Sequence, residues 1–245
     1  MLTFIMSLLS KAVGTVLEKT LLAPASVASV TTLGGFRLIE LRGEGLKKSG
    51  WSPGDKLRVK LGDLELRTYT PFLWDDKKGI AQLLAWLPGR GPGSEWASSV
   101  KVGESFYFKG PKDSLKLSKA DEGPVVFFGD ETAIGAAAAL RLSRPGDKSL
   151  RFIFELEAPD DAHVVLIALG MQDAVRVEKS GDQSHLKLAR KQIQAWVGES
   201  NETPMIFLVG NQDSVKTLKA KLQDKLPDAK IKAKVYWREG KRGLD

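Results

Sequence analysis

The residues best suited to chemistry in this sequence are Arg67, Thr68, Tyr69 and Thr70, which close an alternating strand pattern and run directly into Pro71. An arginine can neutralise a phosphate, an aromatic ring can cover a flat ligand, and a hydroxyl can hydrogen-bond to the edge of that ligand. A flavin dinucleotide presents all three of these features. The same residues could also form an ordinary strand end with a surface arginine, so the other motifs must decide between the two interpretations.

A second motif is a glycine-rich loop between a predicted strand and a short predicted helix. Glycines allow the backbone to approach a ligand closely, and the amide groups at a helix N-terminus attract phosphate. Ser94 could cap this helix or donate to a pyrophosphate, and taken alone the loop could be a simple turn. With the arginine–tyrosine strand, it predicts the second half of a dinucleotide cradle. Its candidate residues are Arg90, Gly91, Pro92, Gly93, Ser94, Trp96 and Ala97.

Two further motifs lie in the second half of the chain. Asp130, Glu131, Thr132 and Ala133 follow a buried strand, at the position where open parallel sheets bind ligands. The full glycine-rich fingerprint is missing there, and the two carboxylates could simply cap a helix. The last predicted strand ends with a second group, in which one aromatic ring could cover a ring system while the other packs inside. Its alternative is a core tryptophan with a solvated basic tail, and its residues are Tyr236, Trp237 and Arg238.

The elements that would position these residues fall into two groups. Short alternating strands separated by turns predict a small antiparallel barrel, with strands at 29–32, 36–41, 56–61, 64–70, 80–87 and from 105. After Gly123, apolar strands alternate with helical stretches, which predicts a parallel, doubly wound sheet with strands at 124–129, 150–156, 174–178, 205–209 and 231–237. We therefore predict an amphipathic helix over 1–24, a β-barrel domain over 25–122 and an α/β domain over 123–245.

The composition limits the chemistry that is available. The 245-residue chain contains no cysteine and two histidines, His163 and His185, which argues against a protein-ligated redox metal. If the protein transfers electrons, an organic cofactor must carry them. A net charge of +7 favours anionic partners such as nucleotides, nucleic acid, acidic lipids or anionic metal chelates. Because no segment is suited to span a bilayer and the apolar N-terminus lacks a basic leader, we expect a cytoplasmic protein.

In their order along the chain, these motifs resemble those of siderophore-interacting proteins, which are flavin-dependent ferric-chelate reductases related to ferredoxin–NADP reductases. The resemblance runs from about Ser26 to Gly243. It departs from the family pattern at Leu87-Pro88-Gly89-Arg90, where a histidine–glycine pair is frequent, at Gly93, where alanine is usual, and at Ile134-Gly135, where Leu-Pro is common. The segments that carry it are 67–71, 91–97, 129–133, 196–199 and 236–240.

The resemblance implies a six-stranded antiparallel FAD-binding barrel followed by a nucleotide-binding α/β domain. Arg67 would neutralise FAD phosphate, Tyr69 would stack on the isoalloxazine, and Thr70 would hydrogen-bond near the flavin N5. Residues 91–94 would wrap the pyrophosphate, and Trp96 would support that loop.

The resemblance also assigns roles in the second domain. Residues 130–132 would line the adenine or nicotinamide side, and residues 236–238 would close the cleft. The implied activity passes electrons from NAD(P)H through FAD to a ferric siderophore and releases Fe(II). Candidates for binding the anionic chelate, each of which could equally be a solvated charge, are Lys47, Lys48, Arg238, Lys241 and Arg242.

The electron donor is less sharply defined by the sequence. Glu155 and Glu157 end the second strand of the α/β domain, where a carboxylate suits a ribose hydroxyl and repels a 2′-phosphate. This favours NADH, whereas the nearby Arg144 could favour NADPH. A ferredoxin is an alternative donor.

Two other functions are compatible with the sequence. A general NAD(P)H flavin reductase or diaphorase would use the same fold and cofactor and would reduce ferric chelates incidentally. A non-enzymatic protein would use the basic region from Lys216 to Arg242 to bind nucleic acid or a membrane surface. Against the second, Lys216, Lys219 and Lys221 alternate with leucines as on the solvated face of an amphipathic helix. We therefore expect a monomer with no nucleic-acid partner and no stable membrane insertion.

Overall fold

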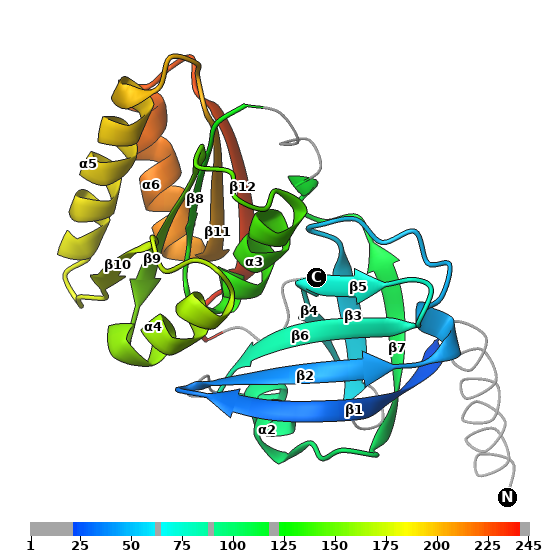
Figure 1. The fold of residues 1–245 in the computed structure, drawn as a ribbon. Coiled ribbons are helices and arrows are strands. Elements are labelled where there is room, and N and C mark those ends of the chain that lie inside the picture. Colours follow the sequence, from blue (N-terminus) through cyan, green and yellow to red (C-terminus); the bar gives the residue numbers. More distant parts are fainter. Residues whose placement is uncertain (1–21, 62–64, 88–90, 118–122, 241–245) are drawn as a thin grey trace, which may run out of the picture.

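The computed structural model describes residues 22–61, 65–87, 91–117 and 123–240, which form two domains (Figure 1). Most of the helix expected over 1–24 lies outside these residues, as do Arg90, Lys241 and Arg242. Residues 22–24 are described and are not helical, because the first strand already begins at Ala23. The expected boundary at 122/123 falls between the last strand of the first sheet and the first strand of the second.

The first domain is an antiparallel sheet of seven strands that curls into a barrel-like form (Figure 1). Its core is built by period-two alternation, as in the third strand, where Leu57, Val59 and Leu61 are buried and the residues between them are not. The strand order is β4-β3-β7-β1-β2-β6-β5. The strands are β1 (Ala23–Leu33), β2 (Phe36–Arg42), β3 (Lys56–Leu61), β4 (Glu65–Tyr69), β5 (Leu73–Asp75), β6 (Ile80–Trp86) and β7 (Ser105–Lys112), with the short helices η1 (Glu44–Leu46) and α2 (Pro92–Ser99) between them.

The sheet has one strand more than the six that the resemblance implies. The additional strand is β5, whose Leu73 to Asp75 pair with β6. Proline has a fixed φ and no amide hydrogen, so Pro71 ends β4, and the Phe72 amide then donates to the carbonyl of Gln82 at 3.0 Å. The chain thereby passes from β4, at one edge of the sheet, to β5, at the other, which brings the two edges towards closure.

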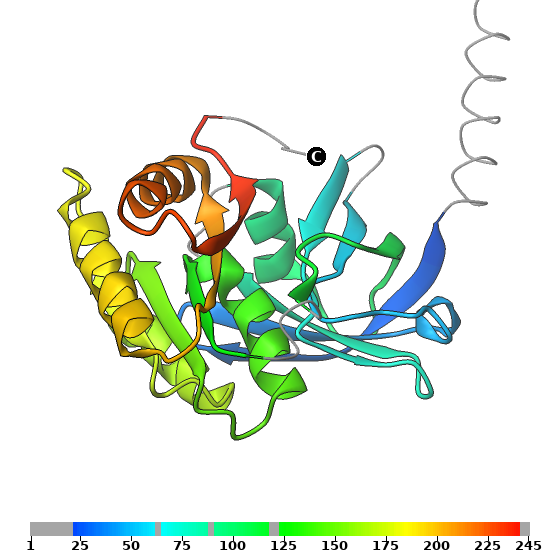
Figure 2. The ribbon, with the colours of Figure 1, turned by 90° about the horizontal axis from the view of Figure 1, so that it is seen from above.

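The second domain confirms the predicted doubly wound parallel sheet. Its strand order is β10-β9-β8-β11-β12, and every pair of neighbours is parallel. One face packs on α3 and α4 and the other on α5 and α6 (Figure 2). The elements are β8 (Val125–Gly129), η3 (Glu131–Ala133), α3 (Ile134–Ser143), β9 (Leu150–Leu156), α4 (Pro159–Ala168), β10 (Val175–Glu178), α5 (Ser184–Glu199), β11 (Met205–Asn211), α6 (Gln212–Lys225) and β12 (Lys230–Trp237).

The two domains share one apolar core. Phe36 and Phe72 of the barrel belong to the same buried cluster as the alanines of α3 and the phenylalanines of the parallel sheet. Two glycines allow the backbones to meet closely, since a Cβ on Gly135 would lie 3.1 Å from the Thr70 carbonyl oxygen and one on Gly34 would lie 2.5 Å from that of Asp161. The hydroxyls of Thr70 and Tyr236 also hydrogen-bond across the interface, at 2.9 Å. Contacts of this kind fix the relative position of the domains.

No helix among the described residues is long and apolar enough to cross a membrane.

Substitution of Gly34 tests the close approach of the β1–β2 turn to α4. Gly50 is the comparison, because it also has a positive φ (+67° against +52° at Gly34) but would place a Cβ in open space. Alanine at either position should cost about 1 to 2 kcal/mol for the left-handed backbone. Gly34→Ala should lose roughly 1 to 3 kcal/mol more than Gly50→Ala, because its methyl group overlaps the backbone of α4. Urea unfolding followed by circular dichroism measures both, and equal losses would show that the β1–β2 turn does not pack as described.

Candidate functional site at the domain interface

The end of β4 brings the predicted phosphate-binding and ring-covering residues onto one face. Pairing of β3 with β4 places Arg67 opposite Val59, Thr68 opposite Arg58 and Tyr69 opposite Leu57. Because side chains alternate along a strand, Arg67 and Tyr69 share a face and Thr68 points to the other, where it is exposed. Thr68 therefore lies on the opposite face of the strand from Arg67 and Tyr69.

Tyr69 joins this strand end to the glycine loop, the two segments that the sequence analysis assigns to one cradle. Its hydroxyl donates to the carbonyl of Gly93 at 2.9 Å, and its ring lies against Trp96 with centroids 5.5 Å apart. Burial raises the pKa of Tyr69 well above its usual value, so the hydroxyl keeps the proton that it donates. A Cβ on Gly93 would lie 3.3 Å from the Tyr69 hydroxyl and 3.6 Å from the Arg67 Cγ. Alanine, usual at this position in the resembling family, would narrow that space.

The glycine loop leads into α2 with no side chain capping the helix. Gly91 stands at the N-cap with φ +115°, and Pro92 opens the first turn. Ser94 does not cap the helix, since its hydroxyl donates to the carbonyls of Trp86 and Leu87 and ties the loop to the end of β6. Uncapped amides at a helix N-terminus carry partial positive charge, and the arginine of β4 lies beside them.

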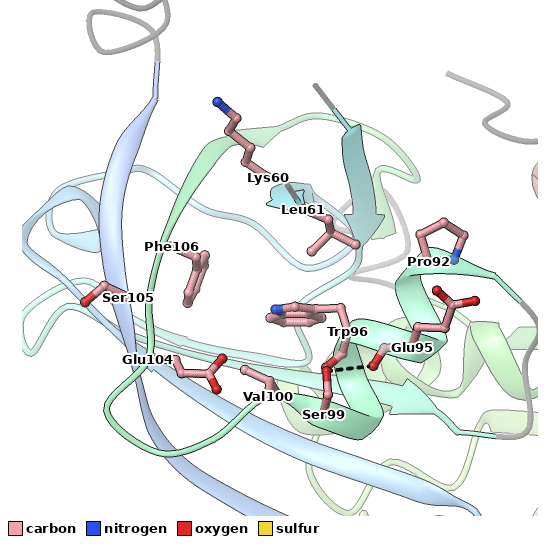
Figure 3. Close-up of a pocket in the computed structure, with 10 residues that line it drawn as sticks. All are labelled: Lys60, Leu61, Pro92, Glu95, Trp96, Ser99, Val100, Glu104, Ser105 and Phe106. Atoms are coloured by element: carbon pink, nitrogen blue, oxygen red, sulfur yellow. Dashed lines mark hydrogen bonds between the residues drawn. The ribbon is translucent and has the colours of Figure 1, made fainter. Parts of the chain in front are cut away.

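A pocket of about 390 Å³ opens beside α2 (Figure 3). Trp96 forms one wall, and its ring contacts Tyr69 at 5.5 Å and Phe106 at 6.0 Å. Trp96 therefore contacts both the pocket and the β4 motif. Ala97, another candidate from the loop, is fully buried on the barrel side of α2. The residues that line the pocket are Lys60, Leu61, Pro92, Glu95, Trp96, Ser99, Val100, Glu104, Ser105 and Phe106.

Asp130 lies buried at the carboxyl end of β8 and holds the neighbouring strands together. One carboxylate oxygen accepts from the Thr132 amide at 2.9 Å and from the Thr132 hydroxyl at 2.5 Å. The other accepts from the Asn211 amide and from the Trp237 indole, both at 2.7 Å. The carboxylate thus links the ends of β8, β11 and β12. Capping was the alternative interpretation of this motif, and it describes what Asp130 does here.

Glu131 faces the end of β10, where Lys179 follows the strand. Its carboxylate accepts from the Lys179 ammonium at 2.8 Å and from the Glu157 amide. Burial raises the pKa of Glu131, and the charge of Lys179 opposes that rise. The ammonium also lies 5.8 Å from the ring centre of Trp86 and 5.7 Å from that of Trp237. Ala133, the last residue of this motif, is fully buried in the core shared by the domains.

Two groups expected to select the electron donor have other partners. Glu155 is buried, and one of its oxygens accepts from the Ser214 hydroxyl at 2.9 Å and lies 2.8 Å from His185 Nε2. Arg144 binds Asp147 and the carbonyl of Gly123, at the end of the sheet opposite to the carboxyl ends of its strands. Neither is available to a ribose or a 2′-phosphate. Glu157 is exposed and remains a candidate.

The three residues that end β12 have different surroundings. Tyr236 is half-buried, its hydroxyl meets Thr70 across the interface, and burial raises its pKa to about 12. Trp237 turns to the carboxylate of Asp130, whereas Arg238 is exposed. The structure therefore brings Tyr236 to the β4 motif through its contact with Thr70.

The candidate lysines for chelate binding lie elsewhere. Lys47 and Lys48 directly follow η1 in the chain. The blue segment after β2, to which they belong, lies at the end of the barrel away from the α/β domain (Figures 1 and 2). Lys47 is paired with Glu44 at 2.7 Å. Arg238 is thus separated from them. No cluster of three potential metal ligands occurs in the part of the chain that the structure describes.

Lys179 and Trp86 were not predicted as site residues. The contact between Lys179 and Glu131 joins positions 48 residues apart in the chain. A basic residue directly after a parallel strand was the one local signal that could have identified Lys179.

Solved structures of known proteins share this fold. The crystal structure of a siderophore-interacting protein from Aeromonas hydrophila matches with a TM-score of 0.69 at 18% identity, over 91% of this chain and 94% of the other. One from Acinetobacter baumannii matches with a TM-score of 0.68 at 18% identity, over 90% and 92%. A ferredoxin reductase of carbazole 1,9a-dioxygenase matches with a TM-score of 0.69 at 18% identity, over 87% and 68%.

At these identities the structural matches show the fold. A separate family model, described as siderophore-interacting protein, matches residues 123–240, which cover the whole described α/β domain. The α/β domain of this chain is therefore similar to the corresponding part of siderophore-interacting proteins.

Proposed function

We propose that this protein is a flavin-dependent ferric-siderophore reductase that passes electrons from NAD(P)H through FAD to Fe(III)-siderophore and releases Fe(II). The observation that carries the proposal is the meeting of three motifs that are far apart in the sequence. The β4 strand end contacts the glycine loop through Tyr69 and Gly93, and it contacts the end of β12 through Thr70 and Tyr236. A cofactor held there would lie between the two domains.

The residues present fit a flavin dinucleotide. The uncapped N-terminus of α2 and the guanidinium of Arg67 supply positive charge for a pyrophosphate. The backbone at Gly91 has open space around it, since a Cβ there would meet nothing within 4 Å. The Arg67 guanidinium is held by the Leu66 carbonyl at 2.9 Å and by Glu65. Because it is already oriented, Arg67 would lose little freedom on binding a phosphate.

Each residue of the site then has a definite task. Bound FAD would supply two-electron exchange with the nicotinamide and one-electron exchange with iron. Arg67 and the loop amides would hold its phosphates, and Tyr69 and Trp96 would keep that loop in place. Thr70 and Tyr236 would hold hydroxyl groups beside the ring edge, with the proton retained on Tyr236 because its pKa is raised to about 12. No acid, base or protein-bound metal is needed, because ferrous iron leaves hard oxygen chelators far more readily than ferric iron.

Two nicotinamide dinucleotides, NADH and NADPH, are candidates for the electron donor. Glu157 at the end of β9 is exposed and would repel a 2′-phosphate, so NADH is the donor that we propose. A general flavin reductase remains the competing function, because the same fold and cofactor would serve it. Saturation by a ferric siderophore at low concentration separates the two, since a general reductase has no site for the chelate.

The activity can be tested on purified protein reconstituted with FAD. Under nitrogen, NADH should bleach the flavin absorbance, and adding a ferric siderophore should restore it while a ferrous-specific dye reports iron release. The rate should saturate with siderophore concentration. Protein that binds no FAD would refute the proposal, and a rate that rises linearly with siderophore would favour the general reductase.

Arg67 should contribute most of the charge that holds the cofactor. Arg67→Ala removes charge-assisted hydrogen bonds to phosphate, which should weaken FAD binding by about 10- to 100-fold. Arg42→Ala is a matched control, because Arg42 lies on the same barrel and its side chain is 62% exposed. Titration of the apoprotein with FAD measures both affinities. If both variants bound FAD equally well, the phosphate would lie elsewhere.

Arg238 is the chelate-binding charge that we propose, because it lies two residues after Tyr236 and is exposed. Arg238→Ala should raise the KM for an anionic ferric siderophore several-fold at low salt and less at high salt, since salt screens exposed charges. Lys48→Ala removes the same charge from the loop on the other side of the barrel. A larger effect at Lys48 than at Arg238 would move the chelate site to that loop.

A further inference from the structure

The carboxyl ends of the parallel strands carry negative charge where a nucleotide-binding sheet usually offers positive groups. Asp130 and Glu131 follow β8, Glu155 is the last residue but one of β9, and Glu157 follows that strand. The dinucleotide donors of the proposed function carry a negatively charged pyrophosphate. Left uncompensated, the carboxylates would repel it.

The backbone amides that normally hold a phosphate at this position are also engaged. At the first strand-to-helix turn of such a sheet, phosphate binds the free amides of the helix N-terminus. Here the Thr132 amide donates to the Asp130 carboxylate at 2.9 Å, and the Ala133 amide donates to the Asp130 carbonyl at 3.0 Å. Asp130 thus occupies the amides of Thr132 and Ala133 with its own oxygens, and we infer that a donor phosphate needs a further partner.

Lys179 is a cation placed to serve as that partner. Its ammonium lies 2.8 Å from Glu131 and 3.9 Å from Glu157, and its side chain is 19% exposed. It stands between Trp86, at the end of β6 in the barrel, and Trp237, at the end of β12. Trp86 also anchors the glycine loop through the hydroxyl of Ser94. Lys179 therefore sits where the parallel sheet meets the proposed FAD site.

We propose that Lys179 binds the pyrophosphate of the nicotinamide dinucleotide, and that it exchanges the carboxylate of Glu131 for this phosphate when the donor binds. The inference rests on the proposed function and assigns a residue to its donor site. Glu131 would hold the lysine in place in the absence of donor. The exchange replaces one charge-assisted hydrogen bond by another, so the donor does not have to pay for ordering a free lysine side chain.

The position of Lys179 favours the pyrophosphate over the 2′-phosphate. Glu131 follows β8, which is the middle strand of the five, and a dinucleotide crosses such a sheet with its pyrophosphate near the middle. The ammonium keeps its proton there, because the charges of Glu131 and Asp130 hold the pKa of Lys179 above its usual value although burial works to lower it. NADH and NADPH share the pyrophosphate, so they should depend on Lys179 equally.

Calorimetric titration of the FAD-loaded protein with ADP-ribose tests the proposal without turnover. Lys179→Met should weaken ADP-ribose binding by about tenfold or more, whereas Lys179→Arg should retain most of the affinity. Lys187→Met is the matched control, because it removes the same charge from an exposed position on α5 and should leave binding unchanged. Equal affinities in Lys179→Met and Lys187→Met would overturn the proposal.

A second variant tests the exchange of partners. Glu131→Gln removes the competing carboxylate, so ADP-ribose should bind several-fold more tightly than to the unmodified protein. Donor binding should also change the fluorescence of the tryptophans beside the lysine in the unmodified protein and less in Lys179→Met. Weaker binding to Glu131→Gln would refute the exchange. A loss confined to NADPH in Lys179→Met would place the lysine at the 2′-phosphate and overturn the assignment.

Failure of this inference can be distinguished from failure of the proposed function. Lys179→Met should bind FAD with unchanged affinity, and its flavin, once reduced by light, should be reoxidised by ferric siderophore at the normal rate. If the unsubstituted protein fails both measurements, the proposed function itself is refuted. A weakened FAD affinity in Lys179→Met alone would mean that the lysine serves the cofactor and not the donor.

Discussion

The structure depends on one buried carboxylate, that of Asp130. A charged group out of contact with water is tolerated only when its hydrogen-bonding capacity is met. Asp130 meets it with two backbone amides, one hydroxyl and one indole, drawn from η3, β11 and β12. Position 210 must be glycine for this arrangement, since a Cβ there would lie 2.4 Å from the same carboxylate. The register of three strand ends is thereby tied to a single residue.

This constraint reaches the proposed cofactor site through β12. The Trp237 indole is held by Asp130. The pairing of β11 with β12 shifts at this point, since Gly210 pairs with Val235 and Asn211 with Trp237. Tyr236 lies between these two pairs, and its hydroxyl meets Thr70 at the end of β4. The apolar core that Phe36 and Phe72 share with α3 fixes the distance between the two domains. The contact between Thr70 and Tyr236 thus depends on the bond that holds the end of β12 and on the packing that holds the two domains together.

The sequence predicted the elements well because their patterns are local. Strands β3 and β9 begin and end where alternation and apolar runs place them. The strand end and the glycine loop were predicted as two halves of one cradle, and Tyr69 joins them through its hydroxyl, a contact that the sequence analysis did not assign to it. What local patterns could not show is which polar groups satisfy one another. Glu155 was predicted to face a ribose and instead meets His185 and Ser214, 30 and 59 residues away in the chain. The short strand β5 was missed because three residues after a proline carry too little periodicity.

Gly135 shows how a departure from the family pattern fits this interface. A larger residue there would press on the Thr70 carbonyl, because even a Cβ would lie 3.1 Å from it. Ile134, beside it, is fully buried in the core that joins the domains. Ile134 therefore fills space in this core with an apolar side chain, whereas Gly135 leaves space for the Thr70 carbonyl. Thr70 carries both the carbonyl that Gly135 accommodates and the hydroxyl that meets Tyr236. The smallest residue of α3 thus stands against the strand end that the proposed cofactor needs, and the closeness of the two domains at that point follows from the absence of its side chain.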